Sequence, residues 1–204
     1  MKTQNPFFRI PVYLTLLVLS VSVVSCSSSE DNSPDWQLVW SDEFEGVEGA
    51  TLDQSKWNFE IGRGNNGWGN NELQYYTDRT ENASLDGEGN LVITAKKENY
   101  EGANYTSARI TTQGKLELTY GRIEARLKTP FGTGLWPAFW LLGIPMEGQT
   151  WPEIGEIDIM ELRGQAPTVV ASTVHGPGYS AGNGITKDYR LTDSRFDTEF
   201  HVFA

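Results

Sequence analysis

The sequence predicts an all-β protein, arranged as a β-sandwich or jelly roll. Short runs rich in β-branched, aromatic and other apolar residues recur along the chain, and Gly, Asn and Asp separate them. No stretch carries the long apolar repeat of 3.6 residues that an amphipathic helix requires. Many short strands joined by regular turns are typical of sandwiches and jelly rolls.

The predicted strands begin with the alternating segment 36–40 and continue to the last residues of the chain. The final run, Phe200 to Phe203, has no turn or polar tail after it. We therefore expect a C-terminal fragment boundary here, with further strands missing and a sheet edge left unpaired; a last strand that simply stops is the alternative. Strands are expected at 36–40, 91–95, 108–112, 121–128, 135–142, 154–162, 169–175 and 200–203.

Length and charge narrow the classes of partner. A chain of 204 residues suggests one domain with a short appendage. The formal net charge of −11 disfavours nucleic acid and anionic lipid surfaces as partners, because both would repel it. A neutral partner is expected instead.

The first residues are typical of an export signal. Lys2 and Arg9 form a basic start, and the run 10–24 is mainly apolar. That run is too short for an ordinary transmembrane helix, which needs about 20 residues. We therefore interpret residues 1–25 as a signal peptide. A core helix or an ordinary cleaved signal is the alternative.

A cysteine ends this signal. The segment Val23 to Cys26 is similar to a bacterial lipobox, in which the cysteine is lipidated and becomes the new N-terminus. The polar residues that follow, with Pro34 among them, favour a tether over residues 26–35. We expect a lipoprotein anchored in the outer membrane through Cys26, facing either the cell surface or the periplasm. Cys26 is the only cysteine, so an intrachain disulfide is excluded.

The stretch most telling for function holds three carboxylates within six residues. Strand alternation places Glu156 and Asp158 on one face and Ile157 and Ile159 on the other. Strict alternation would turn Glu161 towards the apolar face, and a single bulged residue at position 159 or 160 would return it to the acidic face. Because neighbouring acids repel one another, function explains this arrangement better than stability does.

Paired carboxylates on one face can cleave a glycosidic bond. Cleavage with retention needs a nucleophile and a general acid/base about 5–5.5 Å apart. Glu156 and Glu161 suit the pair, and Asp158 between them can hydrogen-bond to Glu156 and adjust its charge. Crowded acids titrate as a group, so one of them can stay protonated near neutral pH. An acidic strand that merely faces solvent is the alternative.

The motif Glu-Ile-Asp-Ile-Met-Glu at 156–161 resembles the catalytic motif of glycoside hydrolase family 16, in the bulged form typical of laminarinases. The resemblance extends over 36–204 and implies a β-jelly roll of two curved antiparallel sheets with the substrate cleft on the concave face. It also implies that Glu156 is the nucleophile, Asp158 its assistant and Glu161 the acid/base. Further segments that resemble bacterial endo-β-1,3-glucanases lie at 40–44, 68–76, 105–110, 120–126, 134–140 and 174–176.

Three tryptophans are candidates for the floor of the cleft. Trp136 and Trp140 lie on the same side of a predicted strand, with Phe139 on the other side, and Trp151 lies in the loop before the acids. Aromatic rings pack well against the C–H faces of sugars. Burial in the core is the alternative for each.

The resemblance adds three substrate-binding candidates. Asn71 and Arg109 match positions that hold sugar hydroxyls in relatives, and His175 matches a histidine near the acid/base. From the residues alone, each would more commonly be a turn, surface or core residue.

We expect a hydrolase that cleaves internal β-1,3 bonds of laminarin-type glucans and acts as a monomer. Alternatives are mixed-linkage β-1,3-1,4-glucan or a marine galactan as substrate, and a non-catalytic glucan-binding protein on the same fold.

No cofactor is expected for catalysis, since two His and one Cys make a zinc site implausible. The resemblance implies a structural Ca²⁺ held by Glu43 and the main-chain oxygen of Gly89. The segment Gly62 to Gly67 matches G-x-G-x-x-G, but no βαβ unit surrounds it, so it is predicted to be a loop.

Overall fold

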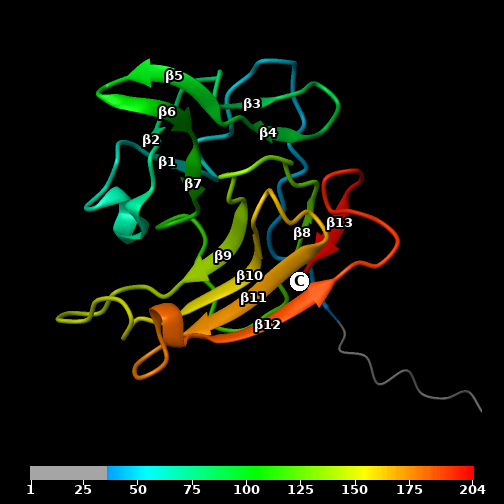
Figure 1. Ribbon diagram of the computed structural model, residues 1–204. Helices are drawn as coiled ribbons and strands as arrows, with labels where there is room; N and C mark the ends of the chain where they lie inside the picture. Colours follow the sequence, from blue (N-terminus) through cyan, green and yellow to red (C-terminus); the bar gives the residue numbers. More distant parts are fainter. Residues whose placement is uncertain (1–35) are drawn as a thin grey trace, which may run out of the picture. The chain divides into compact units, whose positions relative to one another are not determined.

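The computed structural model describes residues 36–204, and nearly all of its regular structure is β (Figure 1). The predicted signal peptide, tether and lipidated Cys26 lie outside the described residues. Within the described part of the chain, no helix is long and apolar enough to cross a membrane. The elements are β1 (Asn58–Glu60), η1 (Gly67–Asn71), β2 (Tyr75–Tyr76), β3 (Ala83–Leu85), β4 (Leu91–Ile93), β5 (Lys96–Tyr100), β6 (Ala103–Ser107), β7 (Arg109–Thr111), β8 (Ala125–Leu127), β9 (Ala138–Leu142), β10 (Glu156–Leu162), β11 (Val169–His175), η2 (Ala181–Asn183), β12 (Ile185–Arg190) and β13 (His201–Phe203).

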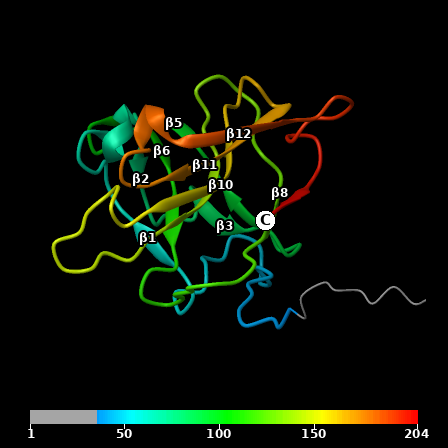
Figure 2. The ribbon, with the colours of Figure 1, turned by 90° about the horizontal axis from the view of Figure 1, so that it is seen from below.

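Hydrogen bonding groups these strands into five small sheets. The largest is antiparallel, in the order β12-β11-β10-β9, and Figure 2 shows β12 at its edge with β11 and β10 beside it. The others are β2-β6-β5, β1-β7, β3-β4 and β13-β8. One pair, β2 with β6, is parallel, which departs from the purely antiparallel expectation. Strands of two to seven residues, with register shifts in β5 and β10, interrupt the ladders that two continuous sheets would need.

Two apolar clusters pack inside Leu38–Ala204, which forms one compact unit. The first fills the space between the four-stranded sheet and the β8–β13 pair. The second lies under the N-terminal loops and β1, β3, β4 and β7. The buried members of the first are Met160, Leu162, Val170, Phe196 and Phe203, and those of the second are Leu52, Ala83 and Ala108.

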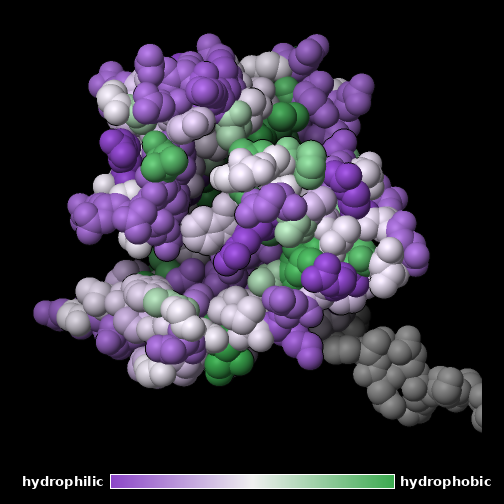
Figure 3. Space-filling view, in the orientation of Figure 1, coloured by the Kyte–Doolittle hydropathy of each residue, from purple (hydrophilic) through white to green (hydrophobic). Residues whose placement is uncertain are grey.

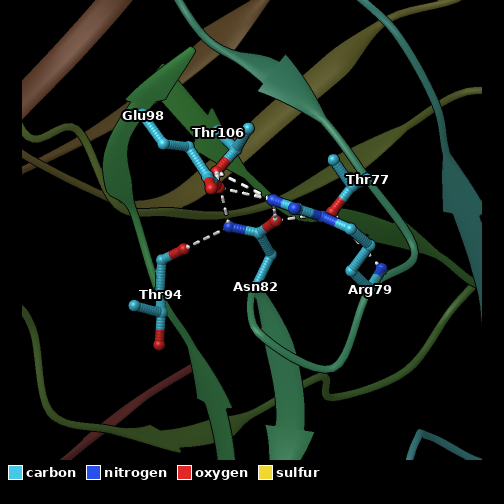
Figure 4. A network of polar contacts seen from close by, with 6 residues as sticks. All are labelled: Thr77, Arg79, Asn82, Thr94, Glu98 and Thr106. Atoms are coloured by element: carbon cyan, nitrogen blue, oxygen red, sulfur yellow. Dashed lines mark hydrogen bonds and ion pairs between the residues drawn. The ribbon is translucent and has the colours of Figure 1, made fainter. Parts of the chain in front are cut away.

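A buried polar network holds the chain between β2 and β3 against β4, β5 and β6 (Figure 4). Asn82 is fully buried and uses its whole side-chain amide. Its Oδ1 accepts from Thr77 at 2.6 Å and from Arg79 at 2.9 Å, and its Nδ2 donates to the carbonyl of Thr94 and to Thr106, each at 3.0 Å. Glu98 completes the network by accepting from Arg79 and Thr106. Apart from Nε of Arg79, the polar groups of these side chains have partners, so burying them costs little.

Some predicted strands differ from the structure. The segment 36–40 forms no strand, and Leu38 and Val39 remain 83% and 76% exposed because no described strand pairs with them. The strand predicted over 121–128 is shortened to β8. In contrast, β5, β6 and β12 were not predicted, because their sequences are too polar to show an alternating pattern.

The Gly62 to Gly67 segment is a loop, as predicted. It turns through Asn66, which has a left-handed backbone, and enters the irregular π-turn η1, where Trp68 and Gly69 also have positive φ. On the face of the molecule seen in Figure 3, apolar side chains form separate patches within a mainly polar surface. That agrees with the low apolar content and the acidic charge of the chain.

The Asn82 network yields a stability prediction. Asn82→Ala removes two donors and one acceptor, so the Thr77 hydroxyl loses its acceptor and the Thr94 carbonyl loses its side-chain donor, while Arg79 and Thr106 keep Glu98. We expect the free energy of unfolding to fall by about 1–3 kcal/mol, measured by chemical denaturation. Asn65→Ala is the matched control, because Asn65 is exposed and belongs to a loop. Equal stabilities of the two variants would contradict the role given to Asn82.

Candidate active site

Strand β10 carries the three carboxylates, and one extra residue interrupts its pairing. Across to β9, the partners of Asp158 and Met160 are adjacent residues, so Ile159 between them has none. The register to β11 also shifts between Asp158 and Glu161. Ile159 is therefore a β-bulge, as the sequence predicts, and it restores Glu161 to the face that carries Glu156.

The pairing with β9 shows that the three acids share one face of the sheet. Their β9 partners are alternate residues of that strand, and alternate residues of a strand lie on the same side. Met160 and Leu162 take the opposite face, where they are 2% and 1% exposed in the core. The partners of Glu156, Asp158 and Glu161 are Leu142, Trp140 and Ala138, in that order.

Ile157 lies on the face opposite the acids. A residue on that apolar face would be expected to be buried, but Ile157 is not. It is 47% exposed, and so are its row neighbours Val174 at 40% and Ile185 at 65%. In the described residues, the core cluster that covers this face extends along β10 from Ile159 to Leu162 and does not reach Ile157.

Asp158 is the central acid of the group. Only 4% of the residue is exposed, and its Oδ2 lies 3.1 Å from Nε2 of His175, which ends β11 and pairs with Glu156. Burial raises the pKa of Asp158, the charges of Glu156 and Glu161 raise it further, and a hydrogen bond to Glu156 adds to them, which brings the pKa to about 8. Asp158 is therefore mainly protonated at neutral pH.

A protonated Asp158 makes a polar contact with each of its two neighbours, Glu156 and His175. Its carboxyl group donates a hydrogen bond to Glu156, and its Oδ2 lies 3.1 Å from Nε2 of His175. Nδ1 of His175 has no hydrogen-bond partner in the described residues. The chain thus keeps a neutral acid between two glutamates.

Each of the two glutamates also accepts one indole N–H. Nε1 of Trp136, two residues before β9, donates to Oε1 of Glu161 at 3.0 Å. Nε1 of Trp151, in the loop before β10, donates to Oε2 of Glu156 at 2.5 Å. Trp151 also lies against His175, with ring centroids 6.0 Å apart. The sequence placed these tryptophans at the cleft, but it gave no indication of these hydrogen bonds.

Arg109 connects β7 with the four-stranded sheet through Trp140 on β9. Its guanidinium lies between two indoles, 4.5 Å from the ring of Trp68 and 4.8 Å from the ring of Trp140. It also forms an ion pair with Glu60, its cross-strand partner on β1. Cation–π contacts of this kind favour a fixed guanidinium. Trp68 and Glu60 were not among the predicted site residues, since only the turn at η1 and the β1–β7 register bring them to Arg109.

The remaining predicted residues lie away from these contacts. Asn71 ends η1 and is exposed, and no described hydrogen bond joins its side chain to the three acids. Glu43 and Gly89 lie beside each other, because a Cβ added to Gly89 would be 3.6 Å from the main-chain oxygen of Glu43. Cys26 lies outside the described residues.

In the described chain, one set of side chains is close enough to share a metal ion. Atoms of Glu156, Asp158 and His175 lie within 4.8 Å of one another. Their mutual contacts already account for this closeness, since Nε2 of His175 lies 3.1 Å from Asp158 and Asp158 donates a hydrogen bond to Glu156. The set is therefore best described as a hydrogen-bonded acid group.

Residues 68–204 match the family described as glycosyl hydrolases family 16. The chain belongs to this family. It is 45% identical over 200 residues to the beta-glucanase of Rhodothermus marinus, covering 93% of this chain and 67% of that protein. It is 39% identical over 181 residues to the glucan endo-1,3-beta-glucosidase A1 of Niallia circulans, covering 82% of this chain and 26% of that protein.

Among solved structures, the laminarinase catalytic domain of Thermotoga maritima is 49% identical, with a TM-score of 0.76 over 83% of this chain and 69% of that domain. The chain thus has the β-jelly roll that the sequence predicted. It spans from about a quarter to about two thirds of the length of these relatives.

The raised pKa of Asp158 predicts a pH-dependent stability. The folded protein holds a proton on Asp158 that the unfolded chain releases near pH 4, so this group stabilises the fold at low pH. That stabilisation is lost as the pH rises towards about 8. In Asp158→Asn, an amide takes the place of the neutral acid and this dependence disappears.

We therefore expect the free energy of unfolding of Asp158→Asn, relative to that of the wild type, to rise by about 1–3 kcal/mol as the pH is raised from 5 to 8. Urea denaturation of both proteins at each pH measures this difference. Asp193→Asn, on an exposed loop, is the control. A constant difference between Asp158→Asn and the wild type across this range would contradict the protonated state of Asp158.

Proposed function

We propose that this family 16 protein is a retaining endo-glycosidase that hydrolyses internal β-1,3 bonds of laminarin-type glucans. The observation that carries the proposal is the bulge at Ile159, which puts Glu156 and Glu161 on one face with a protonated Asp158 between them. The names of the similar proteins, beta-glucanase and glucan endo-1,3-beta-glucosidase, support the choice of substrate.

In the first step, a carboxylate oxygen of Glu156 attacks the anomeric carbon of the sugar. The bond between that carbon and the glycosidic oxygen breaks, and the proton of Glu161 passes to the departing oxygen. The products are a glycosyl ester on Glu156, an ionised Glu161 and a glucan fragment with a new hydroxyl group.

In the second step, Glu161 takes a proton from a water molecule as the water oxygen attacks the same carbon. The ester bond to Glu156 breaks, Glu156 leaves as a carboxylate, and Glu161 is protonated again. Two inversions at one carbon give net retention.

Asp158 and His175 support both steps without bonding to the sugar. As Glu156 leaves, negative charge returns to its carboxylate, and the hydrogen bond from protonated Asp158 stabilises that charge. His175 keeps Asp158 in place from the neighbouring strand. Asp158 and His175 thus provide a fixed, largely buried polar group next to Glu156.

Replacing the nucleophile tests the assignment. Glu156→Gln cannot form the ester, so we expect laminarin hydrolysis to fall by about 1,000-fold or more while glucan binding persists. Reducing-sugar release and affinity electrophoresis in laminarin gels measure the two properties. Glu153→Gln, at an exposed glutamate three residues earlier, is the matched control. Normal hydrolysis by Glu156→Gln would sink the assignment.

The linkage preference needs a panel of polysaccharides. We expect the wild type to release oligosaccharides from laminarin faster than from mixed-linkage β-1,3-1,4-glucan or agar, as followed by chromatography of the products. Faster release from either alternative would change the substrate but keep the two glutamates in their roles.

We also propose a structural Ca²⁺ beside Glu43 and Gly89. Their exposed positions and the closeness of Gly89 to the Glu43 backbone would allow a carboxylate and a main-chain oxygen to meet, which are ligands that Ca²⁺ prefers. Calorimetry with and without a chelator tests it. We expect a lower melting temperature with chelator, whereas an unchanged value would remove the idea.

The lipobox-like segment supports a further proposal, that Cys26 is lipidated and anchors the enzyme in the outer membrane. We expect a protein expressed with its first 35 residues to take up labelled palmitate and fractionate with membranes, and Cys26→Ser to do neither. Label retained by Cys26→Ser would contradict this anchor.

A further inference from the structure

The two glutamates at the ends of the acid row are each in contact with one indole. Trp136 reaches Oε1 of Glu161 at 3.0 Å, and Trp151 reaches Oε2 of Glu156 at 2.5 Å. The two tryptophans come from different segments, one just before β9 and one in the loop before β10. The two residues are 49% and 42% exposed, so each keeps surface open to solvent as well as its N–H bond.

An indole N–H can donate a hydrogen bond but cannot accept one. The oxygen that it touches must therefore act as an acceptor, so it cannot point a proton of its own towards the indole. For Glu161, this leaves Oε2 as the oxygen that carries the proton for the leaving group. For Glu156, it leaves Oε1 as the oxygen that has no indole donor and is placed to attack.

We propose that Trp136 and Trp151 are positioning residues that select which oxygen of each catalytic glutamate reacts. This rests on the proposed function, since it assigns the reacting atoms within that mechanism. When substrate covers the site and excludes water, water no longer competes for the indole N–H groups and the carboxylates. Both hydrogen bonds then hold the carboxylates more firmly. A nucleophile and an acid held in one orientation lose less entropy at the transition state.

Trp140 provides a contrast within the same site. It lies opposite Asp158 on the same face, but the guanidinium of Arg109 covers its ring at 4.8 Å. No described hydrogen bond joins its N–H to Glu156 or Glu161. A tryptophan that serves only as part of the floor should therefore behave like Trp140, and a positioning tryptophan should not.

Replacing tryptophan with phenylalanine keeps an aromatic face but removes the N–H. Two substrates separate an effect on the acid/base from an effect on the nucleophile. Laminarin needs an acid to protonate its leaving oxygen, whereas 2,4-dinitrophenyl β-laminaribioside releases a stable phenolate without one. Both substrates need the nucleophile. Comparing kcat and KM of the variants on the two substrates therefore reports which glutamate each indole serves.

We expect Trp136→Phe to lower kcat/KM about tenfold more on laminarin than on the dinitrophenyl substrate. Trp151→Phe should lower kcat about tenfold on both substrates, with KM little changed. Trp140→Phe should act on both substrates mainly through KM. Equal losses on the two substrates for Trp136→Phe, or no loss for either variant, would overturn the proposal.

A spectroscopic measurement tests the same contacts without turnover. In a ¹⁵N–¹H spectrum, the seven tryptophans give indole resonances that Trp136→Phe and Trp151→Phe assign by deletion. Glu161→Gln weakens the acceptor and should move the Trp136 proton upfield while Trp151 stays in place, and Glu156→Gln should do the reverse. If neither resonance moves, the positioning role is wrong. An inactive wild type with these selective shifts would refute the proposed function and leave the contacts standing.

Discussion

The structure depends on a single extra residue in β10. A strand cannot by itself place acids at 156, 158 and 161 on one side and keep Met160 and Leu162 in the core on the other. The bulge at Ile159 resolves this conflict because it changes the alternation once. The apolar core cluster and the acid group therefore fix each other, since moving the bulge would turn either a glutamate into the core or a core residue into the cleft.

Electrostatics then separates three chemically similar carboxyl groups. Asp158 is the most buried of them and lies between Glu156 and Glu161, so it keeps a proton to about pH 8. Glu156 and Glu161 are more exposed to solvent than Asp158. Each accepts a hydrogen bond from an indole N–H, a group that can donate but not accept. Neighbouring strands supply the other partners, with His175 from β11 and Trp140 from β9. The site is thus built across three strands, although its acids come from one.

Much of this could be predicted from the sequence, because the patterns involved are local. The alternation around Glu156 and the need for a bulge follow from the spacing of a few residues. The all-β class follows from short apolar runs between turn residues. Polar strands such as β12 carry no such pattern, and the segment 36–40 carries the pattern without a described partner strand. The contacts of Trp136, Trp151 and Trp68 depend on loop geometry between distant segments, which spacing along the chain does not encode.

The most direct test of the central claim is to trap the covalent intermediate. A 2-deoxy-2-fluoro-β-laminaribiosyl fluoride forms the glycosyl ester but slows its hydrolysis, so the labelled residue can be found by peptide mass spectrometry. If the bulged strand works as described, the sugar is found on Glu156 and nowhere else. A label on Asp158 or Glu161, or turnover without any label, would contradict the roles assigned to the three acids.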